Sequence, residues 1–342
     1  MVVKTVTKRK KVILSIIGIF IILNLIPFLI PIHFPYDPAT GCSFMVKGWH
    51  VELEKCKKQK KAVNVPGYIL GRPVTVIGKL CFYDNDKLIS ISIPKQTRKI
   101  DNYVFALCTN LETFEAKNVT SIGAQVFYMD SALKTISCGG GLKTIGRCAF
   151  GKCENITSIE LNDHLESIGS YAFENTGITQ LPDIGKNVRI GSGVFSCSKW
   201  EKDQKDDFIV INKSLQAYKG KKQTIVIPNG ITVISGAFDA SVDNNEYPIK
   251  LKTVYIPTSV TAIDSCSFYD QGDVTVYIPA SVTEIGMETV KSEDEPENDN
   301  IFEDPSSATI VTTAGSAAEK YARDHNITCK IVDSWTVPDA SY

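Results

Sequence analysis

The stretch "LKTISCGGGLKTIGRCAFGKCENI", residues 133–156, contains two short patterns that recur along this chain of 342 residues. The first, "LKTISC" (133–138), ends in alternating apolar and polar residues, which is typical of a short half-buried strand. The second, "IGRCAF" (145–150), places a glycine after an isoleucine and a phenylalanine four residues later. The glycine predicts a tight turn, and the phenylalanine predicts a ring buried between neighbouring segments of chain.

The hexad I-G-x-x-small-F, or a close variant of it, occurs nine times. Most copies start 22 or 23 residues apart. An interval of 44 residues after residue 190 equals two periods, and one of 29 residues contains the extra polar stretch "DASVDNNEYPIK". The copies are "IGKLCF" (77–82), "IDNYVF" (100–105), "IGAQVF" (122–127), "IGRCAF" (145–150), "IGSYAF" (168–173), "IGSGVF" (190–195), "ISGAF" (234–238), "IDSCSF" (263–268) and "IGMETV" (285–290). Such a period is the signature of a repeat architecture.

The second pattern, L-x-x-I-x-I, follows most hexads as one strand in each period. Its copies are "LISISI" (88–93), "LETFEA" (111–116), "LKTISC" (133–138), "ITSIEL" (156–161) and "LKTVYI" (251–256). A proline often ends this strand, as at Pro94, Pro228, Pro257 and Pro279. A single strand of this length cannot bury its apolar face alone, but stacked strands form a continuous parallel sheet. The repeat therefore predicts a solenoid.

These residues resemble the BspA-like leucine-rich repeat family, whose repeats read approximately L-x-x-I-x-I-P-x-x-V-x-x-I-G-x-x-A-F-x-x-C. The resemblance extends over roughly residues 60–331. It implies a leucine-rich-repeat right-handed coil with one parallel sheet and short turns on the other side. The last hexad departs from the pattern, because Val290 stands where the family has a phenylalanine.

The resemblance also implies an order of domains. An N-terminal lead-in coil covers 42–76, leucine-rich repeats cover 77–290 with a degenerate double repeat at about 196–233, and an acidic loop and C-terminal cap cover 291–342. The residues support the cap independently. Ser316 and Glu319 form a capping box that predicts the start of a short helix, Asn326 can close that helix, and a final strand follows.

The N-terminus combines a basic tail, residues 1–11, with an apolar segment, residues 12–32. Ser15 and Asn24 are the only polar residues of that segment, which is long enough to cross a bilayer core of about 30 Å. The basic tail places the N-terminus in the cytoplasm. We therefore expect a signal-anchor transmembrane helix over 12–32, a linker over 33–41, and a single-pass cell-membrane protein with extracellular repeats.

Two other fates of the N-terminus stay open. Cleavage as a signal peptide would release the repeats or leave them associated with the cell wall, although "IPIHFPYDPAT" lacks the usual small-residue site. Acylation of Cys42 in "ATGC" (39–42) would make a lipoprotein. The apolar segment does not abut this sequence, however, and Ala39 is smaller than the aliphatic residue that a lipobox prefers.

Charge argues against nucleic-acid binding. Lys4, Lys8, Arg9, Lys10 and Lys11 lie in the N-terminal 41 residues with Asp37 as the one acidic residue. The whole chain has 37 basic and 38 acidic residues, so its remainder is mildly acidic. A nucleic-acid binder needs a basic face for phosphates.

The ten cysteines raise the question of a metal or redox site. Cys138, Cys148, Cys153 and His164 lie within 27 residues, but no C-x-x-C pair is present. In register with the repeat, Cys153 shares the third position after the phenylalanine with Asn85, Cys108, Asp130 and Thr176. Structural thiols are favoured, and a disulfide or a metal site remains an alternative. His164 reads as an exposed turn residue.

Neither catalysis nor a cofactor has support in the motifs. There is no H-E-x-x-H, nucleophile elbow or phosphate-binding glycine loop. The acidic run "SEDEPENDN" (292–300) offers calcium-type oxygens but lacks the spacing of a calcium loop, so a solvated insertion is favoured over a calcium site. The residues of this run that could hold calcium are Asp294, Glu295, Glu297 and Asp299. We expect a non-enzymatic protein without a cofactor or a catalytic or metal site.

The exposed face of the parallel sheet is the candidate binding surface. Its expected outward residues are Ser90, Ser92, Thr113, Glu115, Thr135, Ser137, Ser158, Glu160, Thr253, Tyr255, Thr275 and Tyr277. The alternative is that these polar residues face water and bind no ligand. The resemblance implies an adhesin-like bacterial surface protein that binds an extracellular protein or glycan of the host or of neighbouring cells. A structural envelope spacer without a diffusible ligand is the other hypothesis.

Overall fold

The computed structural model describes residues 31–35, 41–57, 61–239, 249–287, 299–334 and 337–338. The chain divides into two compact units, residues 1–142 and 143–342. Each unit is a stack of short parallel strands joined by tight turns. The predicted solenoid of leucine-rich-repeat type is therefore confirmed.

The elements are short throughout both units. The first unit contains β1 (Ile32–Phe34), β2 (Cys42–Lys47), β3 (His50–Cys56), β4 (Ala62–Asn64), β5 (Tyr68–Ile69), β6 (Arg72–Ile77), β7 (Ser90–Ser92), β8 (Lys99–Ile100), β9 (Thr113–Glu115), β10 (Ser121–Ile122) and β11 (Thr135–Ser137). The second contains β12 (Thr144–Ile145), β13 (Ser167–Ile168), β14 (Arg189–Ile190), α3 (Lys199–Asp203), β15 (Phe208–Ile211), β16 (Ser214–Tyr218), β17 (Thr224–Val226), β18 (Val233–Ile234), β19 (Thr253–Tyr255), β20 (Ala262–Asp264), β21 (Thr275–Tyr277), β22 (Glu284–Met287), the 3₁₀ turn η1 (Pro305–Ser307), β23 (Thr309–Thr312), α4 (Ala317–Asp324) and β24 (Thr328–Ile331).

The first unit begins with antiparallel strands and continues as parallel coils. β1 pairs with β2, and β2 pairs with β3, both antiparallel, whereas β3 pairs with β6 in parallel. β1 includes Ile32, the last residue of the predicted membrane segment, and two residues of the predicted 33–41 linker. A β-meander therefore precedes the first coil.

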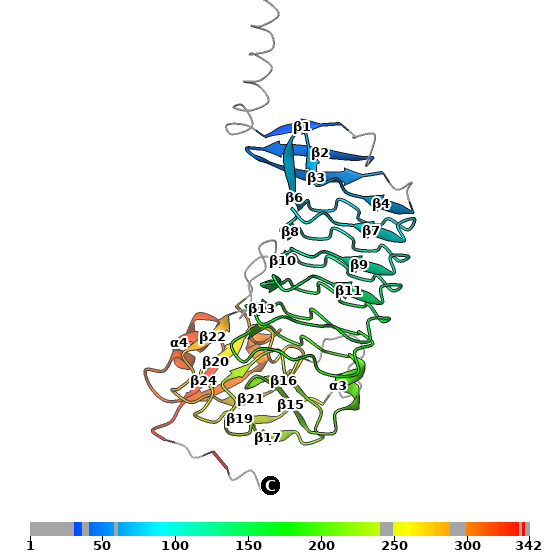
Figure 1. Ribbon diagram of the computed structural model, residues 1–342. Helices are drawn as coiled ribbons and strands as arrows, with labels where there is room; N and C mark the ends of the chain where they lie inside the picture. The colour runs from blue at the N-terminus through cyan, green and yellow to red at the C-terminus, as the bar shows by residue number, and fades with distance from the viewer. Residues whose placement is uncertain are drawn as a thin grey trace, which may run out of the picture. The chain divides into compact units, whose positions relative to one another are not determined.

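Most periods contribute two strands, so the prediction of one parallel sheet was wrong. The L-x-x-I-x-I strands β4, β7, β9 and β11 form one sheet of the first unit. The two-residue strands at the isoleucine of each hexad continue from β6 through β8 to β10 as a second sheet. Figure 1 shows these two ladders on separate sides of the first unit. Where the hexad has a glycine the neighbouring coil lies very close, since a Cβ added at Gly123 would meet the Asn102 backbone N at 2.8 Å, but β8 pairs equally with Asp101 at that position.

The second unit repeats this arrangement with one hairpin in the predicted double repeat. β12, β13 and β14 pair in parallel, and β17, β19, β21, β23 and β24 form a five-stranded parallel sheet. β15 and β16 form an antiparallel hairpin whose second strand continues in parallel into β18, β20 and β22. The double-length repeat thus accommodates its extra residues in α3 and this hairpin.

One predicted strand is absent among the described residues. Residues 156–161, "ITSIEL", have no strand, although the pattern predicts one. The segment that follows one period later contains Pro182, which has no N–H group to donate to a neighbouring ladder. One backbone hydrogen bond, from the Thr179 N–H to the Thr157 carbonyl oxygen at 3.3 Å, still joins the two coils, so the alternating pattern alone does not produce a strand here.

The hexad phenylalanines form stacks inside each unit, as predicted. In the first unit the ring centroid of Phe105 lies 5.3 Å from that of Phe82 and 5.3 Å from that of Phe127. In the second unit Phe150 and Phe173 are 5.3 Å apart. Burial of each ring contributes about 1.5–3 kcal/mol, so this column is a large part of the core.

The capping box, short helix and final strand predicted near the C-terminus are present. Ser316 is the N-cap of α4, and its Oγ accepts a hydrogen bond from the Glu319 N–H at 3.1 Å. Asn326 follows the helix in a left-handed conformation, and β24 comes next. The ring of Phe302 packs against that of Phe268 with centroids 5.5 Å apart and planes tilted by 31°, so a ring from beyond the acidic run takes the next place in the column.

Two predictions concern segments that the structure does not describe. Most of the predicted membrane segment, residues 12–30, lies outside the described residues, and among those described no helix is long and apolar enough to span a membrane. Val290 and most of the acidic run, including Glu293, Asp294, Glu295 and Glu297, also lie outside them.

Candidate functional site

The predicted sheet face in the first unit consists of two rows of small polar side chains. In register, Ser90 lies beside Thr113 and Thr113 beside Thr135. The second row aligns Ser92, Glu115 and Ser137. Apolar partners such as Phe114 point to the opposite side and are buried. Period-two alternation thus directs one row inward and two rows toward solvent.

The equivalent face in the second unit carries a row of threonines. These are Thr224, Thr253, Thr275, Thr309 and Thr328, one from each strand of the sheet. Sequence reasoning identified only Thr253 and Thr275 among them. The signal for the others was the threonine that opens "TIV" at 224, "TIV" at 309 and "TCK" at 328, but the irregular intervals between these coils concealed the register.

The row beside the threonines contains the tyrosine pair. Tyr255 and Tyr277 are directly paired in register, and their rings stack with centroids 4.4 Å apart and planes 22° apart. Burial, followed by the neighbouring Tyr277, raises the pKa of Tyr255. Val226 and Val311 continue this row on either side. The arrangement combines an aromatic surface with hydroxyl groups, which suits a ligand that offers both apolar and polar groups.

None of the twelve predicted face residues is buried. Ser92, Thr113, Glu115, Thr135, Ser137, Ser158 and Glu160 are exposed, and Ser90, Thr253, Tyr255, Thr275 and Tyr277 are half-buried. The structure places ten of them on strands, whereas Ser158 and Glu160 lie in residues 156–161, which have no strand. Glu115 forms an ion pair with Lys117 at 3.4 Å on the surface of the first unit. The face is thus mostly uncharged.

The cysteines at and near the repeat turn occupy the positions that the repeat predicts. Cys153 is fully buried, like Cys108 in the same position of an earlier coil. Cys148 is half-buried, and burial raises the pKa of Cys138 to about 12. His164 is an exposed turn residue, as predicted, and its N–H donates to Asn162 Oδ1 at 2.8 Å. These residues fit structural roles.

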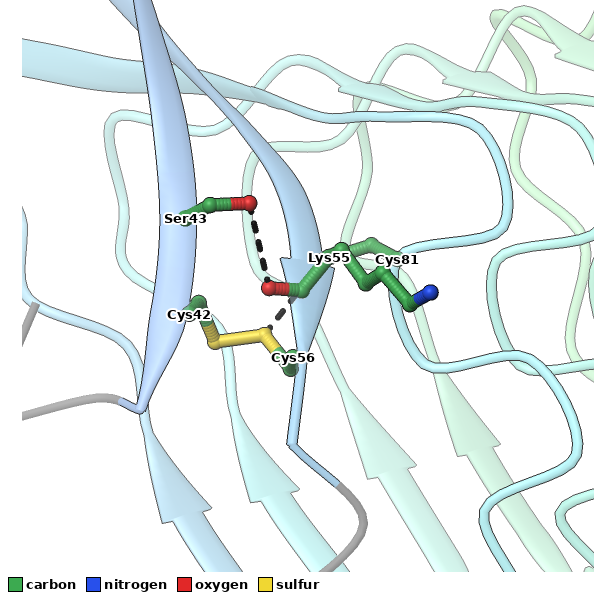
Figure 2. The surroundings of a disulfide bond; sticks show 5 residues. All are labelled: Cys42, Ser43, Lys55, Cys56 and Cys81. Atoms are coloured by element: carbon green, nitrogen blue, oxygen red, sulfur yellow. Dashed lines mark hydrogen bonds between the residues drawn. A yellow bond between two sulfur atoms is a disulfide. The ribbon is translucent and has the colours of Figure 1, made fainter. Parts of the chain in front are cut away.

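A different set of three cysteines comes together at the start of the first unit. Cys42 on β2 and Cys56 on β3 are cross-strand partners that form a disulfide, and Cys56 Sγ lies 3.4 Å from Cys81 Sγ (Figure 2). All three side chains are buried. Burial, and then the charges of Glu52 and Glu54, raise the pKa of Cys81 well above its usual value.

Sequence reasoning missed this group because its members are 14 and 25 residues apart and in different elements. A signal for the pair Cys42 and Cys56 was the turn "GWH" at 48–50, which joins the two strands that carry them. Cys42, the residue of the acylation alternative, is bonded to Cys56 in this structure, and acylation stays an untested prediction.

Solved structures with a similar fold come from several bacteria. A leucine rich repeat protein of T. pallidum is 16% identical and matches over 87% of this chain and 99% of that chain, with a TM-score of 0.41. A leucine rich cell surface protein from Faecalibacterium prausnitzii A2-165 is 19% identical over 90% of this chain and 99% of that chain, with a TM-score of 0.44. The pneumococcal vaccine antigen PcpA is 13% identical over 89% and 99%, with a TM-score of 0.41. A search of the curated proteins found no match.

The sequence model of the BspA type leucine rich repeat region, with six copies, matches residues 63–139, 120–245 and 209–303. These overlapping matches cover more than half of the chain and coincide with the stacked coils of both units. The chain therefore belongs to the BspA-type leucine-rich repeat family.

Proposed function

We propose that this chain is a non-enzymatic, adhesin-like protein of the bacterial cell surface. It binds an extracellular protein or glycan through the outward rows of its L-x-x-I-x-I strands, and an N-terminal segment, residues 12–32, holds it at the membrane. Because a fold does not determine a ligand, support for binding must come from the residues of this face.

The stacked pair Tyr255 and Tyr277 is the observation that carries the proposal. A half-buried tyrosine loses little conformational freedom on binding and offers both a ring and a hydroxyl group, which is why tyrosines are frequent binding hot spots. The two rings lie 4.4 Å apart, and both belong to strands whose neighbours hold them in register. The pair is thus organised before a ligand arrives.

The composition of the surrounding row favours a neutral ligand surface. The neighbouring threonines supply hydroxyl groups that both donate and accept hydrogen bonds. Val226 and Val311 extend the apolar part of the row on the two sides of the pair. Hydroxyl-rich glycans and polar protein loops both match this mixture, whereas a strongly charged ligand does not.

The test is a binding screen of the purified full-length chain against arrays of matrix proteins and glycans. For a ligand found in this way, the double variant Tyr255→Ala/Tyr277→Ala should bind roughly 30-fold more weakly or worse, since a hot-spot side chain contributes about 2 kcal/mol or more. Thermal unfolding of the variant verifies that the sheet remains folded.

Tyr83→Ala is the matched control. Tyr83 is an exposed tyrosine of the first unit that belongs to no strand, and its removal should leave affinity unchanged. Equal affinity of the double variant and the wild type would exclude this face as the binding site. A chain that binds nothing on the arrays but co-purifies with cell-wall material would instead favour a structural spacer.

A further inference from the structure

Cys42, Cys56 and Cys81 bring three sulfur atoms together from three separate elements. Cys42 opens β2, Cys56 closes β3, and Cys81 lies in the turn that follows β6. Their three Sγ atoms lie within 4.8 Å of one another. The Cys56 N–H donates to the Cys81 carbonyl oxygen at 2.8 Å, so the backbone holds these two residues side by side.

A disulfide alone does not account for the third cysteine. Cys81 occupies the fifth position of the first hexad, where other hexads have a small apolar residue such as Val104, Val126 or Ala149. A valine or alanine would therefore pack at this position. The cysteine instead stands in the one hexad whose turn contacts the Cys42–Cys56 pair through hydrogen bonding and sulfur contact.

We propose that, in the reduced chain, the thiolates of Cys42, Cys56 and Cys81 bind one thiophilic metal ion with a filled d shell, such as Zn²⁺ or Cd²⁺. Thiolate sulfurs bind such ions at about 2.3 Å, and a ligand set made of sulfur alone selects soft ions over magnesium or calcium. The spacing of the three sulfurs allows one ion to reach all of them after small side-chain rotations.

The charges around the group favour a cation. Glu52 and Glu54 lie close enough to act electrostatically on Cys81. Lys47 already pairs with Glu52 at 2.7 Å, and His33 pairs with Glu54 at 2.7 Å, so both carboxylates are held in place. Lys47 offsets part of the charge of Glu52, so the negative charge near the sulfurs is less than that of two unpaired carboxylates. The buried position excludes water from competing for the ion.

Metal binding requires reduction of the disulfide first. A dithiol reductant transfers two electrons and two protons to the Cys42–Cys56 bond, which opens to two thiols while the reductant becomes a disulfide. The metal ion then replaces the thiol protons, which pass to solvent. The oxidised group offers one free thiol, Cys81, and should bind the ion weakly.

The experiment uses the full-length chain, reduced with a dithiol that is then removed under anaerobic conditions. Cd²⁺ is the probe, because its thiolate complexes have a charge-transfer absorption that reports sulfur ligation directly. Titration against a competing chelator separates a tight site from weak binding to the other cysteines. We expect one equivalent of chelator-resistant Cd²⁺ in the reduced wild type and none in the oxidised chain.

Single variants identify the ligands. Cys42→Ser, Cys56→Ser and Cys81→Ala should each lose this equivalent, whereas Cys153→Ser, which removes a buried cysteine outside the group, should retain it. Alanine already occupies the equivalent hexad position at Ala149, so it should fit in place of Cys81. In the oxidised state the melting temperature of Cys81→Ala should therefore match that of the wild type. Chelator-resistant Cd²⁺ that persists in Cys81→Ala, or that is absent from the reduced wild type, would overturn the proposal.

Discussion

The hydroxyl group of Tyr171 donates a hydrogen bond to Asp239 Oδ2 at 3.0 Å, although the two residues are 68 positions apart. The ring of Tyr171 passes over Gly193, where an added Cβ would meet Tyr171 Cε1 at 2.7 Å. Arg147 lies over the same ring at 5.2 Å. One tyrosine thus connects coils from three parts of the second unit, and this connection depends on the absence of a side chain at Gly193.

Gly193→Ala should destabilise the protein by roughly 2–4 kcal/mol. Overpacking against a fixed ring costs about 1–3 kcal/mol, and the left-handed backbone of Gly193, with a φ of +55°, adds about 1 kcal/mol for a residue with a Cβ. Urea unfolding of the purified chain measures the change. If Tyr171 is the obstacle, the same substitution made in a Tyr171→Ala background should cost only about 1 kcal/mol.

Gly140→Ala is the control for this pair of measurements. Nothing lies within 4 Å of a Cβ added at Gly140, and its φ is outside the left-handed region. Its effect should stay within about 0.5 kcal/mol. Equal costs of Gly193→Ala in the two backgrounds would show that the ring of Tyr171 does not restrict this position.

The repeat fold could be predicted because each coil buries the same residues in the same order. Isoleucine and phenylalanine recur at fixed places, and the rings of Phe82 and Phe105 stack as this recurrence implies. The second sheet could not be predicted, because strands such as Lys99–Ile100 are too short to show alternation. The ring of Phe302 was equally hidden, since it enters the column from beyond an acidic insertion.

The candidate sites were predictable only where they follow the repeat. Apolar and polar residues alternate in "LKTVYI" (251–256) and in "VTVYI" (274–278), and this alternation predicts that Tyr255 and Tyr277 point outward. The grouping of Cys42 with Cys56 and Cys81 depends on how an antiparallel hairpin joins the first parallel coil. No local pattern contains that information, because the contact is set by register between elements.

Asp130 should make stability decrease as the pH rises. Its Oδ1 accepts from the Cys108 N–H at 2.7 Å, but among the described residues its Oδ2 has no hydrogen-bond partner. Burial raises the pKa of Asp130 well above its usual value. The folded state therefore retains a proton that the unfolded state releases, and the free energy of unfolding falls as the pH rises from about 4.

Asp130→Asn should remove this part of the pH dependence. Asn85 occupies the same position in another coil, so an amide fits there and keeps the acceptor for Cys108. Urea unfolding from pH 4 to pH 8 should show a shallower decline for the variant, and about 1–3 kcal/mol more stability than the wild type at the upper end. Parallel curves for the two proteins would contradict the assignment to Asp130.

Glu201 should contribute a second decline at higher pH. Its Oε2 accepts from the Cys197 N–H at 2.7 Å, and burial raises its pKa to about 7. The folded state holds the proton up to that pH, so stability is lost as the pH rises from the unfolded value of about 4.3 to about 7 and is constant above it. Glu201→Gln should reduce the loss across this range by up to roughly 3–4 kcal/mol. Glu166→Gln is the control, because Glu166 is a surface carboxylate whose pKa is lowered by Lys143, so it should not reduce the decline between pH 5 and pH 7.

Met129→Gly should stabilise the protein, although it removes a side chain. Met129 follows the hexad phenylalanine by two residues and has a left-handed backbone with a φ of +64°. Its side chain is 43% exposed, so little packing is lost. Relief of the left-handed conformation gains about 1–2 kcal/mol, which exceeds the entropic cost of glycine at roughly 0.5–1 kcal/mol. The net gain should be a few tenths to about 1 kcal/mol, measured by urea unfolding.

Ile89→Gly is the control, because Ile89 is similarly exposed but its backbone is not left-handed. This substitution should destabilise the chain by about 1 kcal/mol. Destabilisation by both substitutions would show that the turn at Met129 does not store this strain.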